Sequence, residues 1–296
     1  MSSHSRFDFS GSFVALITPM LEDGKVDFES LKNLVTWHIE SGTQGLVILG
    51  TTAESATLTQ SEQLEVLTTV IEVNNGRLPI IVGNGSNSTS DTIEKTKGFD
   101  PLAIDGYLTV TPYYNKPTQK GMVAHFKAVA AVTDKPVLLY NVPGRTGVDL
   151  SNESVIELMA VDNIIGIKDA TADLTRVAPL KQADASFLLF SGDDATGRQY
   201  VSQGGDGVIS VTANVEPDLM AQMLNALMTG NTDLASTIDS KLSALHEDLF
   251  VEPNPVPAKW ALKAKGLIES DMVRLPLLPM EPIHNNVIKQ ALQKAK

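Results

Sequence analysis

The chain has 296 residues, enough for one large domain or two ordinary ones, and its 43% hydrophobic and 20% charged content is typical of a globular protein. It carries 23 basic and 35 acidic side chains, a formal net charge of -12, which argues against general binding to nucleic acids or anionic membranes. It contains no cysteine, which excludes disulfides and cysteine-zinc sites.

The segment Met1–Ser10 is polar and mixed, without the apolar centre of a secretory signal. No run of about 18 apolar residues occurs anywhere, so we expect no segment that spans a membrane. The absence of cysteine fits a reducing compartment, and we expect a cytoplasmic protein. Short apolar runs recur along the chain, and most are continuous rather than alternating, as expected for strands covered on both faces. They predict eight strands, at Phe13–Thr18, Gly45–Leu49, Pro79–Gly83, Gly106–Thr111, Pro136–Tyr140, Ile164–Lys168, Phe187–Ser191 and Gly207–Val211.

Helical patterns fill the intervals between these strands. The first helix is predicted to begin after the N-cap Asp27 and to end before Gly42. Thr59-Gln60-Ser61-Glu62 has the spacing of a capping box, and Gly76 is predicted to end the helix that follows it. Later apolar stripes are Met122, Phe126 and Val129; Leu219, Met223 and Leu227; and Leu234, Ile238, Leu242, Leu245 and Leu249. Eight strand–helix units predict an α/β protein, a (β/α)8 TIM barrel over residues 1–220, with a C-terminal helical extension over residues 221–296 packed on the barrel.

In such a barrel the chemistry is expected at the carboxyl ends of the strands. Lys168 ends an apolar strand, where an ammonium group is costly unless it is paired or has a function. Because burial disfavours the charged form, a buried lysine is more readily the neutral amine that Schiff-base chemistry requires. The alternative is that the strand ends there and the side chain reaches solvent.

The alternation of side chains along this strand favours the catalytic interpretation. Lys168 shares a face with Gly166 and Ile164, whereas Ile165 and Ile167 face the other way, toward the helices. Lys168 is therefore predicted to point into the barrel, with Gly166 leaving space beneath it.

Other polar residues follow neighbouring strands. Tyr140 is a buried phenol that is either a core residue or a proton shuttle beside an imine-forming lysine. Thr51 is a candidate to hold that phenol, although a threonine after a strand is often structural. Arg145 follows a Pro-Gly turn and is either a surface residue or the local cation that recruits a carboxylate to this acidic protein.

A metal site is not predicted. One carboxylate of Asp193-Asp194 is expected to cap the following helix rather than to bind a metal. The five histidines are scattered along the chain, and none of them pairs with another at ligand spacing.

Three motifs occur in order: Gly50-Thr51-Thr52-x-Glu54-Ser55, Tyr140-Asn141-x-Pro143-x-Arg145-Thr146-Gly147 and Gly166-Ile167-Lys168-Asp169-Ala170. They resemble those of the dihydrodipicolinate synthase / N-acetylneuraminate lyase family of class I pyruvate-dependent enzymes. The likeness covers nearly the whole chain and extends to Thr111-Pro112-Tyr113-Tyr114-Asn115 and to the segment from Glu252 to Trp260.

The resemblance implies that Lys168 forms an imine with pyruvate, which becomes an enamine and attacks aspartate semialdehyde. It implies a proton relay of Tyr140, Thr51 and Tyr114. No metal or organic cofactor would be needed, because the lysine–pyruvate imine is itself the electron sink.

The resemblance also implies the residues that bind the substrates. Thr52, with the backbone beside it, would hold the carboxylate of pyruvate, and Arg145 would bind that of aspartate semialdehyde. Gly192 and Ile209 would line the pocket through backbone groups. The partners are therefore expected to be two small molecules, with no nucleic acid and no membrane.

The paired tyrosines bear on assembly. Tyr113 and Tyr114 lie in a loop that we expect to be extended, so their side chains should point to opposite sides. The resemblance implies that Tyr114 reaches into the site of a neighbouring subunit, in a homotetramer of two tight dimers.

The chain departs from the family's pattern in two respects. Ala53 stands where relatives typically have glycine, so the turn must avoid a positive φ or tolerate strain. In relatives inhibited by lysine, an effector cleft would correspond to Ser55, Ala56, Gln60, Gln63, Asn87, Asp91 and Tyr113. Here Gln60 and Gln63 replace positions that are often histidine, and Asp91 is shorter than the usual glutamate, so we predict weak or absent inhibition by lysine.

Two alternative functions are open at this point. A sugar-acid lyase or aldolase of the same family would run the same pyruvate imine toward cleavage, but lyases usually lack an arginine at the position of Arg145. A non-catalytic binding or regulatory barrel would be favoured by loss of Lys168 or Tyr140, and both are present.

Overall fold

The computed structural model describes residues 9–296, so most of the segment inspected for a secretory signal, Met1–Asp8, lies outside the described residues. Eight strands form one closed parallel barrel in the order β1 to β8, which confirms the predicted (β/α)8 architecture. The strands are β1 (Gly11–Ala15), β2 (Gly45–Ile48), β3 (Ile80–Gly83), β4 (Gly106–Val110), β5 (Val137–Asn141), β6 (Ile164–Asp169), β7 (Leu188–Ser191) and β8 (Gly207–Ser210). Each predicted strand is confirmed to within a few residues.

The helices follow the strands in turn. They are α1 (Phe28–Glu40), α2 (Gln60–Asn74), α3 (Thr89–Phe99), α4 (Gln119–Ala130), α5 (Pro143–Thr146), α6 (Asn152–Leu158), α7 (Val177–Ala183), α8 (Asp194–Ser202), α9 (Pro217–Met228), α10 (Thr232–Asp248), α11 (Val256–Ala264) and α12 (Asn285–Lys294). Short 3-10 turns are η1 (Thr51–Ala53), η2 (Ser55–Thr57), η3 (Leu174–Arg176), η4 (Thr212–Asn214) and η5 (Pro282–His284).

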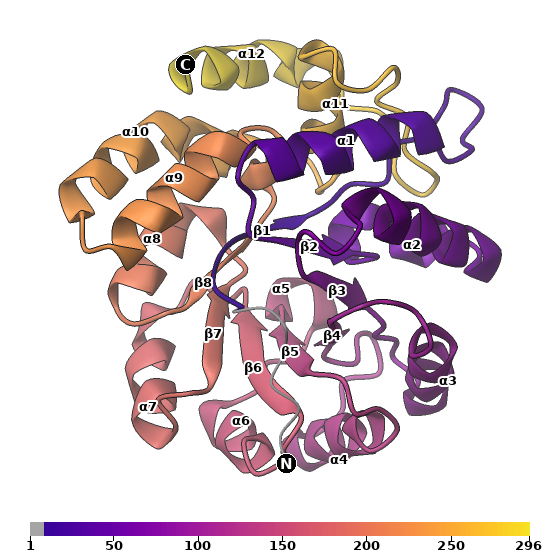
Figure 1. Cartoon of the computed structure of the whole chain (residues 1–296), viewed down its shortest axis with the longest axis vertical. Coiled ribbons are helices and arrows are strands. Elements are labelled where there is room, and N and C mark those ends of the chain that lie inside the picture. The colour runs from indigo at the N-terminus through magenta and orange to yellow at the C-terminus, as the bar shows by residue number, and fades with distance from the viewer. Residues whose placement is uncertain (1–8) are drawn as a thin grey trace. The chain divides into compact units, whose positions relative to one another are not determined.

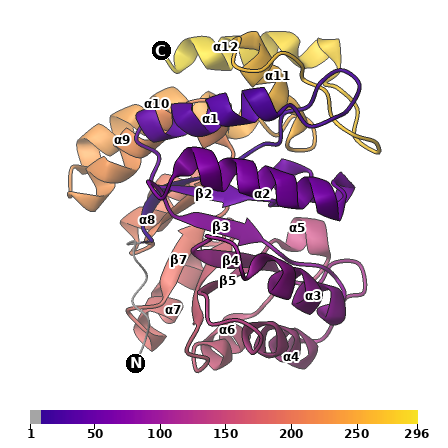
Figure 2. The ribbon, with the colours of Figure 1, turned by 45° about the vertical axis from the view of Figure 1, so that its right-hand side comes forward.

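The chain forms two compact units. One contains Pro79–Ile209 with the first described residues, and within it α3, α4, α6 and α7 follow one another side by side (Figure 1). The other contains Gly11–Leu78 and Ser210–Lys296; within it α1 lies along α2, and α10 packs between α9 and α12 (Figures 1 and 2). The predicted boundary at residue 220, between barrel and extension, stays a prediction.

The helix ends follow the local sequence signals. Asp27 caps α1 by accepting a hydrogen bond from the Ser30 backbone N–H, and Thr59 and Glu62 form both bonds of the predicted capping box. The chain leaves α1 through Gly42 at φ 81° and leaves α2 through Asn75 at φ 44°. The left-handed residue that ends α2 is therefore Asn75, one position before the predicted Gly76.

One predicted helix face was wrong, and a second was confirmed except at its first residue. In α9 the buried face contains Met220, Met223 and Leu224, so the predicted stripe beginning at Leu219 is turned by about one residue. In α10 the predicted Leu234 is 46% exposed, whereas the later members of that stripe are buried.

A buried ion pair joins the turn after β2 to the C-terminal segment. Lys259 is fully buried, and its Nζ lies 2.5 Å from Glu54 Oε1 and donates to the Met272 carbonyl at 2.8 Å. The other carboxylate oxygen of Glu54 accepts from the Arg274 backbone N–H at 2.9 Å. Burial lowers the pKa of Lys259, and the Glu54 carboxylate opposes that shift. Because both side chains are buried away from water, each charge is stabilised by the other.

This pair generates a stability prediction. Replacing Lys259 by Met leaves Glu54 buried without its counter-ion, so we expect the free energy of unfolding to fall by about 3 to 5 kcal/mol in urea melts. Lys263→Met is the matched control on the same helix, because Lys263 pairs with Asp271 while 47% exposed and should cost less than about 1 kcal/mol. Equal losses in the two variants would contradict a buried pair.

Candidate active site

Lys168 is buried at the carboxyl end of β6. Strand register places it between Tyr140 on β5 and Phe190 on β7. Its side chain is 6% exposed, and its Nζ lies 4.6 Å from the centroid of the Tyr140 ring, which is itself 8% exposed. The alternative that Lys168 simply reaches solvent is therefore excluded. The structure brings these two predicted catalytic side chains together, while their catalytic roles stay predictions.

Gly192, directly after β7, makes room for the Lys168 side chain. A Cβ atom built on Gly192 would lie 2.7 Å from Lys168 Cε and 2.8 Å from the Ala170 Cβ, closer than such atoms approach. The Gly192 backbone N–H donates to the Asp169 carbonyl at 2.7 Å, which fixes the distance between the two strand ends. Ile209 on β8 is buried as well. Gly192 was predicted to line the pocket through backbone groups, and its packing against the lysine side chain was not predicted.

The predicted role of Gly166 was wrong. A Cβ on Gly166 would lie 2.5 Å from the Leu188 carbonyl oxygen and 2.9 Å from Leu138 Cδ2, so the space beside it is already filled. Glycine is required there because the neighbouring strands approach closely, and not to leave a gap under Lys168. The pairing of β5 with β6 also shifts by one residue next to Gly166, which interrupts strict alternation before that point.

Asp169 follows Lys168 but belongs to a different set of contacts. Its carboxylate lies 2.6 Å from Arg176 Nε, and both side chains are at least nine-tenths buried. Burial raises the pKa of Asp169, and the Arg176 guanidinium partly opposes this shift. Sequence reasoning missed Arg176. The available signal was an arginine a few residues after the Lys168-Asp169 pair.

Arg145 lies in α5, an exposed helical turn after β5 that ends at Gly147, where φ is 73°. The Tyr114 backbone N–H donates to the Thr146 carbonyl at 3.3 Å, so the loop after β4 and the turn that carries Arg145 are joined. Tyr114 has φ 75° and is 87% exposed, while Tyr113 is 39% exposed. The expectation of an extended loop here was wrong, because the backbone bends at Tyr114.

Thr51 and Thr52 belong to the other unit, in the 3-10 turn after β2. Thr51 is exposed, whereas Thr52 is buried and its hydroxyl accepts from the Asn254 side chain at 2.9 Å. Ala53 has an ordinary negative φ because Glu54 takes the left-handed position at φ 55°. The turn therefore avoids the strain that alanine would meet in place of glycine. The proposed contact of Thr51 with Tyr140 stays a prediction.

The predicted effector residues are distributed over both units. Ser55, Ala56, Gln60 and Gln63 lie in one, and Asn87, Asp91 and Tyr113 in the other. Gln63 is buried, and its amide donates to the Ser55 and Leu58 carbonyls, each at 3.1 Å. This side chain therefore supports the loop before α2. Gln60 and Asp91 are exposed in the first turns of their helices.

The remaining sequence signals have structural explanations. Asp193 caps α8 by accepting from the Thr196 backbone N–H at 3.0 Å, as expected for one carboxylate of that pair. Within residues 9–296, no three His, Asp or Glu side chains gather in a way that would hold a metal ion. None of the helices described is both long enough and apolar enough to span a bilayer.

A closed (β/α)8 barrel whose sixth strand ends in a buried lysine beside a tyrosine has the arrangement expected of a lysine-dependent, Schiff-base-forming barrel enzyme. The model of the dihydrodipicolinate synthetase family matches residues 8–295. The chain therefore belongs to the dihydrodipicolinate synthetase family.

Individual relatives agree with this assignment. The chain is 50% identical over 288 residues to 4-hydroxy-tetrahydrodipicolinate synthase of Shewanella baltica, covering 97% of this chain and 98% of the relative. The crystal structure of dihydrodipicolinate synthase from Acinetobacter baumannii, complexed with pyruvate, matches with a TM-score of 0.95 and 46% identity, over 97% of this chain and 99% of that one. A structure described as the first monomeric dihydrodipicolinate synthase variant matches with a TM-score of 0.94 and 38% identity, over 97% of both chains.

The packing of Gly192 on Lys168 generates a second prediction. Gly192→Ala should displace the lysine side chain and slow its trapping by pyruvate and borohydride by at least about tenfold. The matched control is Gly98→Ala in α3, where a Cβ meets no heavy atom within 4 Å. A Gly192→Ala protein that is trapped as fast as the Gly98→Ala protein would contradict the contact.

Proposed function

We propose that this chain condenses pyruvate with L-aspartate 4-semialdehyde to give 4-hydroxy-tetrahydrodipicolinate, in lysine and diaminopimelate biosynthesis. The observation that carries the proposal is the buried amine of Lys168, 4.6 Å from the centroid of the Tyr140 ring at the end of β6. Membership of the dihydrodipicolinate synthetase family supports it independently. A biosynthetic enzyme of this kind is expected to work in the cytoplasm.

The first half of the reaction is imine formation. The lone pair of Lys168 Nζ attacks the ketone carbon of pyruvate, and the resulting carbinolamine loses its hydroxyl as water. Each step moves a proton, and we propose Tyr140, whose ring centroid lies 4.6 Å from the amine, as the shuttle, with Thr51 and Tyr114 as its relay. Thr52 and the adjacent backbone are proposed to hold the pyruvate carboxylate, and Gly192 and Ile209 to contribute backbone groups.

The second half forms the carbon–carbon bond. Loss of a methyl proton converts the imine to an enamine, whose terminal carbon attacks the aldehyde carbon of the second substrate. The amino group of that substrate then adds to the imine carbon, the ring closes, and the Lys168 amine departs unchanged. Arg145 is proposed to bind the carboxylate of the semialdehyde by its two-pronged guanidinium geometry. We propose that no metal or organic cofactor takes part, since the protonated imine accepts the electron pair.

The exposed tyrosine loop supports a proposal on assembly. Tyr114 is 87% exposed in the single chain, which is unusual for a large aromatic side chain. We propose that it is covered by a second copy of the chain, within a homotetramer of two tight dimers. The relative described as monomeric establishes only that protein's own state.

The mechanism predicts which lysine reacts. Incubation with pyruvate and borohydride should add the reduced three-carbon adduct to Lys168, and peptide mass spectrometry should locate it there. Lys259 is the internal control, because it is buried to a similar degree but donates to Glu54 and to the Met272 carbonyl.

The same protein should then form the cyclic product from aspartate semialdehyde. An unmodified Lys168 peptide would overturn the mechanism. A modified Lys168 without condensation would instead favour the sugar-acid lyase.

A further prediction concerns regulation by lysine. Because the Gln63 amide is held by two loop carbonyls and Gln60 and Asp91 depart from the usual residues, we expect weak or absent inhibition in a steady-state assay. Half-inhibition by lysine below a concentration of about one millimolar would contradict this expectation.

A further inference from the structure

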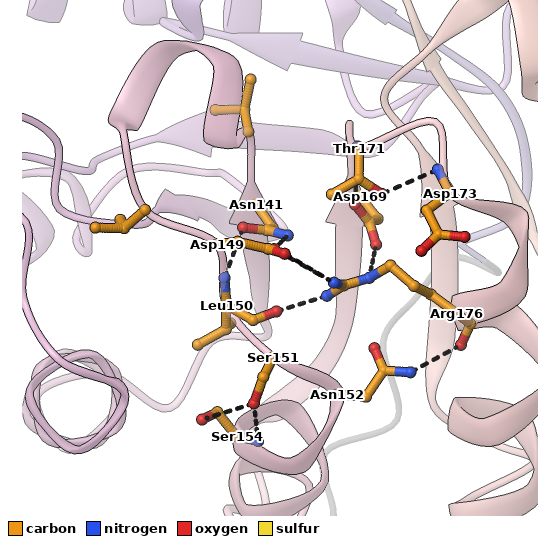
Figure 3. A network of polar contacts seen from close by, with 12 residues as sticks. Asn141, Asp149, Leu150, Ser151, Asn152, Ser154, Asp169, Thr171, Asp173 and Arg176 are labelled. Carbon is orange, nitrogen blue, oxygen red and sulfur yellow. Dashed lines mark hydrogen bonds and ion pairs between the residues drawn. The ribbon is translucent and has the colours of Figure 1, made fainter.

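One arginine connects the two strand ends that carry the proposed chemistry. Figure 3 shows the Arg176 guanidinium with Asp169 on one side and with Asp149 and Leu150 on the other. Its Nε lies 2.6 Å from the Asp169 carboxylate, its Nη1 lies 3.3 Å from both Asp149 oxygens, and its Nη2 donates to the Leu150 carbonyl at 2.5 Å. One planar cation therefore binds groups from two separate segments.

The first of these segments is the loop that carries Arg145. Asn141, the last residue of β5, closes this loop: its side-chain Nδ2 donates to Asp149 at 2.7 Å, and its side-chain Oδ1 accepts from the Leu150 backbone N–H at 3.0 Å. The two ends of the loop, at Asn141 and at Asp149–Leu150, therefore lie side by side (Figure 3). Arg176 binds the loop at its second end, so movement of Asp149 and Leu150 would also move the short turn at Arg145.

The second segment is the end of β6. Asp169 is the neighbour of Lys168 and takes its second anchor from the Thr171 backbone N–H at 3.0 Å. The Ala170 backbone N–H also donates to the Asn141 carbonyl at 2.9 Å, so the β5 and β6 ends are joined outside the ladder as well. Asp169 therefore gives Arg176 a fixed anchor on the strand that carries Lys168.

We propose that Arg176 is a positioning residue, which holds the Arg145 loop at a fixed place relative to Lys168 and so sets the affinity for the carboxylate of the second substrate. The inference rests on the proposed function, because it assigns that carboxylate to Arg145. Arg176 does not touch substrate; it acts through the loop.

The chemistry of the contact requires arginine. Nη1 and Nη2 of one guanidinium hydrogen-bond to Asp149 and to the Leu150 carbonyl while its Nε lies in ion-pair contact with Asp169, a spread of contacts that a single ammonium group does not reproduce. The Arg176 side chain is only 10% exposed and that of Asp169 only 1%, so solvent does not replace the contact when it is lost.

The test compares the two substrates in one variant. In Arg176→Met the KM for aspartate semialdehyde should rise about tenfold, while the KM for pyruvate should change by less than about twofold, because the loop binds only the former. Arg176→Lys keeps a charge beside Asp169 without the fork, so it should retain more thermal stability than Arg176→Met and still show the raised KM for the semialdehyde.

The matched control is Lys181→Met. Lys181 on α7 pairs with Asp206 at 2.7 Å and donates to the Phe187 carbonyl, and its side chain is 19% exposed. These contacts lie just before β7 and β8, at the opposite ends of the strands. Lys181→Met should lower the melting temperature and leave both KM values unchanged. If Arg176→Met does not fold, Asp149→Asn serves in its place. It alters a half-exposed residue of the same loop and should likewise raise the semialdehyde KM.

A double-mutant cycle tests whether Arg176 acts through Arg145. In an Arg145→Ala background, Arg176→Met should add no further increase in the semialdehyde KM. Additive increases, or equal increases in both substrates' KM values, would overturn the proposal and leave Arg176 a residue of stability only. A parent protein that forms no Lys168 adduct and no cyclic product would instead overturn the proposed function.

Discussion

The Lys168 amine is held out of water by its neighbours on both adjoining strands, and the rest of the site depends on this. The ring of Tyr140 lies over it from β5, and Gly192 admits its methylene chain from the end of β7. A free lysine side chain has several rotatable bonds, so fixing it costs conformational entropy before any substrate binds. That cost is met during folding, because the strand register of a closed barrel brings the three residues together. The amine is therefore placed in advance for attack on a carbonyl carbon.

Because side chains alternate along a β-strand, the ends of β5 and β6 present different residues to the two faces of the barrel wall. Tyr140 and Lys168 form the inner pair, and the next residues along, Asn141 and Asp169, form an outer pair. Arg176 contacts Asp169 directly and shares Asp149 as a partner with Asn141. The Asp169 carboxylate is paired with Arg176, so its charge is balanced there and not by the reacting Lys168 amine. The outer pair also anchors the loop that carries Arg145. Substrate recognition and amine placement are thus linked through backbone that neither substrate touches.

Much of this could be predicted from the sequence, and the failures have physical causes. Continuous apolar runs located all eight strands because strands covered on both faces must be apolar. Alternation indicated that Lys168 is buried. It gave the wrong reason for Gly166. Glycine is needed there because Leu188 and Leu138 pack against it, and these residues come from strands whose approach the local sequence does not reveal. Arg176 was missed for the same reason: its partners lie in two segments whose proximity only the fold creates. The buried face of α9 was predicted wrongly because its apolar residues form two neighbouring stripes, one from Leu219 and one from Met220. Tertiary packing decides which stripe is buried.

The central claim is that the Lys168 nitrogen becomes covalently bonded to the ketone carbon of pyruvate. Imine formation expels the ketone oxygen as water, so its reversal in ordinary water must exchange that oxygen. Pyruvate labelled with heavy oxygen at the ketone, incubated with the protein and no second substrate, should lose its label far faster than with the Lys168→Ala protein, as followed by mass spectrometry. Label retained at the rate seen with Lys168→Ala would contradict the account.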